Sequence, residues 1–148
     1  GITKKNKKIN ELIKIKKLEN YKNLEIIENV KEVEKFFEKI NFFIMTSKGE
    51  GFPNSIGESM SFAVPCISSN VGDIPYLIDS KNLIYELQKT NTVFNLIDSI
   101  NNAINIYKNK NSYLELCKKV NNKINNEYNI LQMINNYRVL WEKTLKKI

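Results

Sequence analysis

The sequence contains no histidine, and this absence excludes more chemistry than any other feature of the composition. Zinc catalysis through imidazole ligands, Ser-His and Cys-His nucleophile activation, and imidazole acid–base catalysis all require that ring. The chain cannot run these mechanisms by itself. The side chains left for chemistry are carboxylates, hydroxyls, amides, lysine and arginine.

Cysteines and long apolar runs are also scarce. The two cysteines, Cys66 and Cys117, are too few for a disulfide framework or a metal cluster, and they fit a reducing compartment. No stretch approaches the roughly 18 continuous apolar residues of a membrane-spanning helix, and none resembles a secretory signal. We therefore expect a cytoplasmic protein, located in the cytosol or at the inner face of the membrane.

Positive charge is abundant but lies at the two ends of the sequence. Lysine and arginine number 23 against 16 acidic residues, a formal net charge of +7. Residues 1–20 carry +5 and 101–148 carry +6, whereas 47–100 carry −3. A nucleic-acid-binding face would combine its charge with aromatic side chains or a fold signature, and these lysines instead follow helical patterns among asparagines. We expect no nucleic-acid partner.

The first basic segment predicts an amphipathic helix over residues 4–18. Ile9, Leu12 and Ile13 recur among lysines at helical spacing. A surface helix with one buried stripe is the favoured interpretation. Peripheral association with an anionic membrane is the alternative, because a basic amphipathic helix can also lie on lipid headgroups.

Further along the chain, apolar runs alternate with segments of helical spacing. The runs 42–46 and 64–68 are continuous and indicate buried strands, and shorter ones occur at 24–28 and 83–85. Helical spacing is found at 32–40, 54–62, 74–78, 92–109, 112–126 and 128–148. This order predicts an α/β fold, with a Rossmann-like parallel sheet, flanking helices and a helical C-terminal tail.

No internal repeat or linker divides the sequence, so residues 1–148 are expected to form a single domain. Four short strands are few for a Rossmann-like sheet, and the chain begins with a helix. We therefore interpret it as a fragment of a larger enzyme.

In open parallel sheets, ligands bind outside the carboxyl ends of the strands. The loop that follows residues 42–46 contains Gly49 and Gly51 and runs directly into a predicted helix, where free backbone N–H groups favour an anion. It has neither the Walker pattern nor the dinucleotide glycine fingerprint. Two carboxylates, Glu50 and Glu58, bracket the start of this helix and are the candidate catalytic and binding groups.

The segment FIMTSKGEGFPNSIGESMSFAVPCISSNVGDIPYLI resembles the signature region of the family 4 retaining glycosyltransferases. In that family this region belongs to the C-terminal Rossmann half of the two-domain B-type fold. The resemblance implies transfer of a hexose from a nucleotide-diphospho-sugar to a glycan or lipid-linked acceptor, with bacterial polysaccharide or glycolipid assembly as the setting. It also implies an N-terminal domain of the same protein as a partner and no cofactor or metal ion.

By the same resemblance, Glu50 is the catalytic residue, contacting donor-sugar hydroxyls near the reaction centre, and Glu58 accepts hydrogen bonds from the ribose hydroxyls. The remaining donor-binding residues would face the sugar and the distal phosphate: Ser47, Gly51, Phe52, Pro53, Asn54 and Ser55. The sequence departs from the family pattern at Asp73 and Tyr76, which affects the contacts of the loop that follows residues 64–68. Ala63, where the family usually has glycine, is a mild departure.

Each of these assignments has a simpler alternative. In the simpler alternative, Glu50 is a solvated loop residue, Glu58 belongs to a polar helix face or a cap network, and Asn54 and Ser55 cap the helix. At the level of the protein, the alternative is a non-catalytic module of the same ancestry that binds nucleotide sugar or a partner. Retention of both glutamates favours the enzyme.

Overall fold

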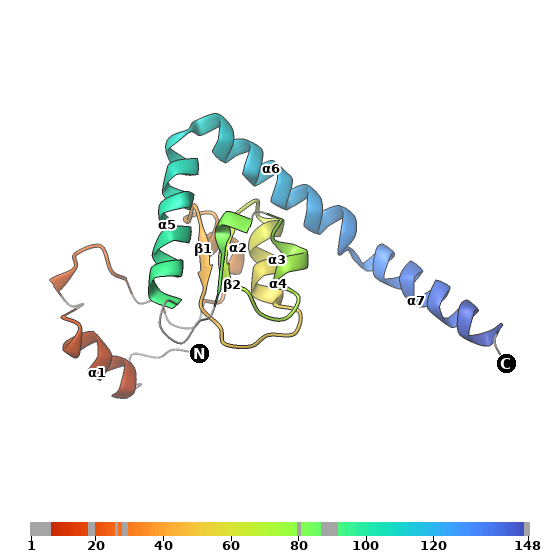
Figure 1. Ribbon diagram of the computed structural model, residues 1–148, viewed down its shortest axis with the longest axis horizontal. Helices are drawn as coiled ribbons and strands as arrows, with labels where there is room; N and C mark the ends of the chain where they lie inside the picture. Colours follow the sequence, from red (N-terminus) through yellow and green to blue (C-terminus); the bar gives the residue numbers. More distant parts are fainter. Residues whose placement is uncertain are drawn as a thin grey trace. The chain divides into compact units, whose positions relative to one another are not determined.

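The computed structural model describes residues 7–17, 20–25, 27, 30–79, 81–86 and 92–146. The chain divides into two compact units, residues 1–36 and 37–148 (Figure 1).

The first unit contains helix α1, Lys7–Ile15, which confirms the centre of the helix predicted over 4–18. The strand predicted over 24–28 is wrong for the residues described there, since 24, 25 and 27 adopt irregular backbone; 26 and 28 lie outside the described residues. The reason is incomplete burial. Leu24 and Ile27 are 48% and 51% exposed, and none of the described strands pairs with this segment.

The second unit is built on a parallel sheet of three strands in the described residues, β1 (Phe43–Met45), β2 (Cys66–Ser69) and β3 (Ile84–Tyr85), in that spatial order. Phe43 is in register with Cys66, and Ser68 with Ile84. The parallel α/β architecture predicted from the sequence is confirmed, with three of the four expected strands.

Helices cover both faces of this sheet. Residues alternate between faces along a strand. Cys66 lies against helix α3 (Asn54–Ser61), where its thiol contacts the Ser59 hydroxyl, whereas the next residue, Ile67, lies in a hollow with Ile100 of helix α5 (Thr92–Lys108). Figure 1 shows α3 and α5 on opposite sides of the strands. The sheet is therefore the middle of three layers.

The crossovers and the C-terminal helices complete the second unit. In this unit, α4 (Ile74–Leu77) and the 3₁₀ turn η2 (Lys81–Leu83) link β2 to β3. Helix α2, Val33–Phe37, precedes β1 in the sequence and spans the boundary between the two units. Helices α6 (Lys110–Glu127) and α7 (Ile130–Leu145) follow α5. Helix α6 packs on α3 and α5. The core contains these fully or nearly fully buried side chains: Ile56, Met60, Ile67, Ile74, Leu77, Leu83 and Tyr85.

Helix α3 ends in a Schellman turn. The N–H of Ala63 donates to the Met60 carbonyl at 2.9 Å, and the N–H of Val64 donates to the Ser59 carbonyl at 3.0 Å. Ala63 has a φ of 58°, the left-handed conformation in which glycine is usual at this position. The turn leads the chain directly into β2.

Helix α7 has no buried residue, and several of its large apolar side chains are exposed, among them Leu131, Tyr137 and Trp141. It begins at a cap in which the Asn129 side chain accepts a hydrogen bond from the Gln132 N–H at 2.8 Å. In the part of the chain that the structure describes, no helix has both the length and the hydropathy needed to cross a bilayer.

Candidate functional site

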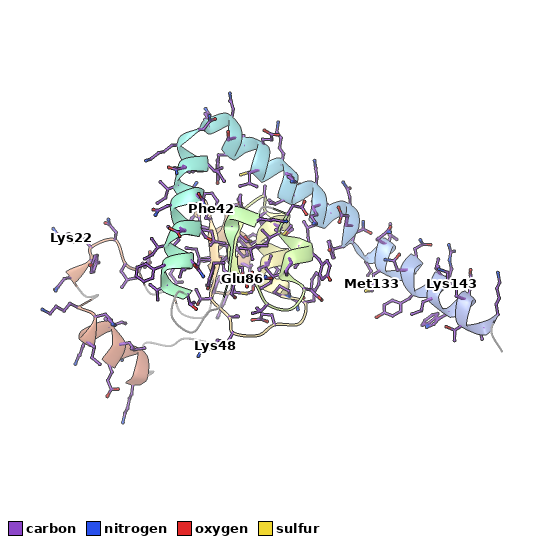
Figure 2. All side chains as sticks on the ribbon, viewed as in Figure 1. Lys22, Phe42, Lys48, Glu86, Met133 and Lys143 are labelled. Carbon is purple, nitrogen blue, oxygen red and sulfur yellow. The ribbon has the colours of Figure 1, made fainter. Side chains whose placement is uncertain are left out.

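The candidate site lies where the parallel strands end. The chain leaves β1 after Met45 and passes through a loop, residues 46–53, into α3; it leaves β2 after Ser69 and turns through residues 70–73 into α4. Because the strands are parallel, both segments emerge at the same edge of the sheet. Lys48 and Glu86, labelled in Figure 2, belong to the segments that follow β1 and β3.

Glu50 and Glu58 are both exposed. Glu50 lies in the loop, and Glu58 lies within α3, beyond its first turn. Neither carboxylate has a hydrogen bond or ion pair to another residue in the described part of the chain. Both are therefore open to a ligand, and the same exposure fits the simpler alternative of solvated glutamates.

The start of α3 presents backbone donors. Pro53 is the N-cap residue and forms no side-chain cap, and its carbonyl accepts hydrogen bonds from the N–H groups of Ile56 and Gly57. Among the described residues, no acceptor faces the N–H groups of Asn54 and Ser55. The first turn of this helix can therefore donate to an anion, with the helix dipole adding about 0.3–1 kcal/mol.

The capping alternative for Asn54 and Ser55 is wrong. Asn54 is the first helical residue, and Pro53 occupies the cap position. The Ser55 hydroxyl donates to the Met45 sulfur at 3.7 Å, so this side chain is directed to the sheet. Any contact of Ser55 with a ligand would come from its backbone N–H.

Phe52 and Ser47 occupy the two ends of the loop. The Phe52 ring packs against the Tyr128 ring, with their centroids 5.6 Å apart, and it lines an open groove together with Asn54 and Tyr137. The half-buried Ser47 lies at the other end, and its carbonyl accepts a hydrogen bond from the Ser69 hydroxyl at 2.6 Å.

Sequence reasoning missed two residues, Ser69 at the end of β2 and Gly72 in the turn that follows it. Gly72 has a φ of +54°, and a Cβ at this position would lie 2.0 Å from the Glu50 carbonyl oxygen. Ser69 is fully buried beneath the loop. The quoted V-G-D-I-P motif contains Gly72, but the residue that it contacts depends on the tertiary fold.

Ser68, one residue earlier on β2, is also fully buried, and its hydroxyl has no hydrogen-bond partner among the described residues. It follows Ile67 on the strand and pairs with Met45 of β1.

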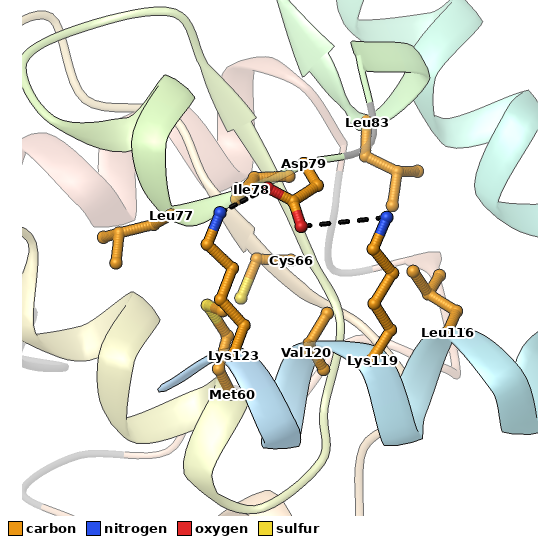
Figure 3. A pocket seen from close by; sticks show the side chains of 10 residues that line it. All are labelled: Met60, Cys66, Leu77, Ile78, Asp79, Leu83, Leu116, Lys119, Val120 and Lys123. Carbon is orange, nitrogen blue, oxygen red and sulfur yellow. Dashed lines mark hydrogen bonds and ion pairs between the residues drawn. The ribbon is translucent and has the colours of Figure 1, made fainter. Parts of the chain in front are cut away.

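A second hollow lies away from this edge, between α4, η2 and α6 (Figure 3). Its volume of about 20 Å³ suits one water molecule rather than a nucleotide. Asp79 at its rim accepts a hydrogen bond from Lys123 and forms an ion pair with Lys119 at 3.7 Å. Burial raises the pKa of the Cys66 thiol in its wall to about 12, so this cysteine is inert core. The hollow is a small packing gap between α6 and the segment that runs from α4 to η2.

In the described ranges, no three histidine, cysteine, aspartate or glutamate side chains cluster as metal ligands. The sequence also contains no Asp-x-Asp pair.

The three-layer fold, with a glycine-bearing loop entering a helix at the carboxyl edge of a parallel sheet, defines a Rossmann-like α/β domain. A family model described as glycosyl transferases group 1 matches residues 1–105, which include the whole loop and α3. The chain belongs to the group 1 glycosyltransferases. A glycosyltransferase function follows, with a nucleotide-sugar donor and an acceptor as its general partners. No curated protein matches the chain significantly.

Proposed function

We propose that this chain is the donor-binding C-terminal domain of a family 4 retaining glycosyltransferase. It would bind a nucleotide-diphospho-sugar and transfer the hexose to a glycan or lipid-linked acceptor. The acceptor would be held by an N-terminal domain of the same protein, in the cytoplasm or at the inner face of the membrane. The observation that carries the proposal is the placement of two exposed carboxylates, Glu50 and Glu58, around the N–H groups at the start of α3 that have no acceptor among the described residues.

The proposed roles follow from the chemistry of these groups. Vicinal ribose hydroxyls can donate to the Glu58 carboxylate in charge-assisted hydrogen bonds of about 1.5–3 kcal/mol each. The N–H groups of Asn54 and Ser55 would hold the distal phosphate. Glu50 would accept hydrogen bonds from the donor sugar and stabilise positive charge that develops at the anomeric carbon. This chemistry requires no resident metal ion or cofactor.

Two charge-neutral variants test these roles. Glu58→Gln is expected to weaken nucleotide binding about tenfold or more, because the ribose contact acts equally in the ground state and the transition state. Glu50→Gln is expected to lower kcat more than it changes nucleotide affinity. The measurement combines titration of UDP, GDP and ADP with transfer kinetics, using the protein that includes its proposed N-terminal domain.

The reverse pattern, with Glu50 governing nucleotide affinity and Glu58 governing kcat, would remove these role assignments. Lys48→Gln, at the exposed position two residues before Glu50, is a matched control for a change of charge in the same loop.

The second candidate function is a non-catalytic module of the same ancestry. The exposure of both carboxylates is compatible with binding alone. This candidate predicts that a nucleotide sugar binds at this site without being a substrate. Glu50→Gln would then leave any transfer activity measured for the protein unchanged.

A further inference from the structure

The loop that carries Glu50 is held by the last residue of β2 and by the turn that follows it. These residues contact three backbone carbonyls of the loop. The Ser47 carbonyl accepts from the Ser69 hydroxyl at 2.6 Å, and the Gly51 carbonyl accepts from the Asp73 N–H at 3.3 Å. Between these two contacts, Gly72 lies against the Glu50 carbonyl.

The contact at Gly72 leaves no room for a side chain. A Cβ there would lie 2.0 Å from the Glu50 oxygen and 2.8 Å from the Gly51 oxygen, both of them backbone atoms that cannot rotate away. Its φ of +54° is also a conformation that favours glycine. By contrast, a Cβ at Gly49 or Gly51 in the loop itself would meet nothing within 4 Å.

Ser69 is fixed in turn by the strand beside it. Ser69 is in register with the buried Tyr85 of β3, and the Asn70 N–H donates to the Tyr85 carbonyl at 2.8 Å. A chain of contacts thus runs from β3 through Ser69 to Ser47 at the base of the loop. The base is tied to the core, while the Glu50 side chain remains exposed.

We propose that Gly72 and Ser69 are positioning residues of the donor site, which set the backbone of Glu50 so that its carboxylate meets the sugar of the donor. This inference rests on the proposed function and adds to it two residues that touch no substrate. The nucleotide part of the donor, assigned to Glu58 and the start of α3, does not depend on them.

Because the nucleotide and the sugar of the donor contact different residues, a loss of the sugar contact can be distinguished from a loss of folded protein. The ratio of the Kd of a nucleoside diphosphate to the Kd of its hexose conjugate reports the sugar contact alone, since a reduced folded fraction affects both values equally. The probes are UDP with UDP-glucose, GDP with GDP-mannose and ADP with ADP-glucose, titrated by NMR into the full chain up to millimolar concentration.

Gly72→Ala and Ser69→Ala are expected to lower this ratio at least fivefold, as Glu50→Gln does, with the affinity for the nucleoside diphosphate within twofold of the unchanged protein. Gly49→Ala, which adds the same methyl group in open space, is the matched control and should leave both values unchanged. Glu58→Gln should weaken both ligands together and leave the ratio near its original value.

Two results separate the failure of this inference from the failure of the proposed function. A ratio unchanged in Gly72→Ala and Ser69→Ala but lowered in Glu50→Gln would overturn the positioning role and keep the donor site. Absence of binding by all six probes, or a ratio unchanged in Glu50→Gln, would remove the assignment of Glu50 and the positioning role with it.

Discussion

Among the described carboxylates, Asp79 is the one whose environment most clearly alters its acidity. The hydrogen bond from Lys123 is the main cause that holds the pKa of Asp79 below its ordinary value of 3.8, with a further contribution from Lys119. The Lys123 side chain is only 12% exposed, whereas Asp79 is 40% exposed, so solvent screens the pair from one side. We expect a modest contribution to stability, of about 0.2–1 kcal/mol.

The pH dependence of this contribution has a defined sign. Because the folded state binds the Asp79 proton less tightly than the unfolded state, the stabilisation is complete above the ordinary pKa of 3.8 and is lost as the pH falls through the lower folded value. Asp79→Asn should therefore lower the free energy of unfolding by up to about 1 kcal/mol at pH 7 and have a smaller effect near pH 3. Urea denaturation at the two pH values measures this.

The control is Glu142→Gln, which removes an ion pair to Arg138 that spans 4.0 Å between two largely exposed side chains on α7. It should leave the unfolding free energy at pH 7 unchanged. An Asp79→Asn effect that is the same at both pH values would show that the carboxylate charge does not act through its lysines.

Among the elements, the strands that begin in continuous apolar runs were the most predictable. The segments 42–46 and 64–68 became β1 and β2. The predicted burial on both faces holds for β2 but is wrong for β1, where Phe43 is half-buried and Ile44 is 44% exposed. The segment 24–28 also has apolar residues, but glutamates lie among them, and burial of such a segment depends on a neighbouring strand that a sequence does not reveal.

For the site, the spacing of Glu50 and Glu58 along the loop and helix was readable from the motif, because both belong to one continuous segment. The contacts of Ser69 and Gly72 with that loop were not. They join residues about 22 positions apart in the sequence, and only the register of β1 on β2 brings them together.

The C-terminal end of α3 offers a direct test at the scale of one element. Ala63 adopts a left-handed conformation that costs an L-residue about 1 kcal/mol relative to glycine, and both hydrogen bonds of the turn come from backbone atoms. Ala63→Gly should therefore raise the free energy of unfolding by up to about 1 kcal/mol, as measured by urea denaturation.

Asn122→Gly, in the exposed middle of α6, is the matched control, because there the backbone is helical and glycine should lower stability. Loss of stability in both variants would mean that the flexibility glycine gives the unfolded chain outweighs the relief of strain at Ala63.

In the second unit as a whole, α7 differs from the other long helices, because none of its side chains is buried. Trp141, the single tryptophan of the sequence, lies on this helix and is 64% exposed, with the Tyr137 ring 6.1 Å away. Its fluorescence therefore reports on this helix alone.

We predict that acrylamide quenches Trp141 in the native chain at low concentration nearly as strongly as it does in urea-unfolded chain. N-acetyltryptophanamide provides the fully exposed reference. Weak quenching with blue-shifted emission would contradict this prediction by showing that the apolar side chains of α7 are covered, and dilution would show whether a second copy covers them.

The strand order of the sheet has a consequence for how this unit is made. The spatial order β1-β2-β3 is also the order along the chain, and each strand pairs with the one synthesised immediately before it. A nascent chain leaving the ribosome can thus add β2 and then β3 to an edge that already exists, with only the crossovers 46–65 and 70–83 to close. By the time Tyr85 has emerged, the Ser47 and Gly51 carbonyls can already be held by their partners, so the loop of Glu50 can take its final form before α5 is synthesised.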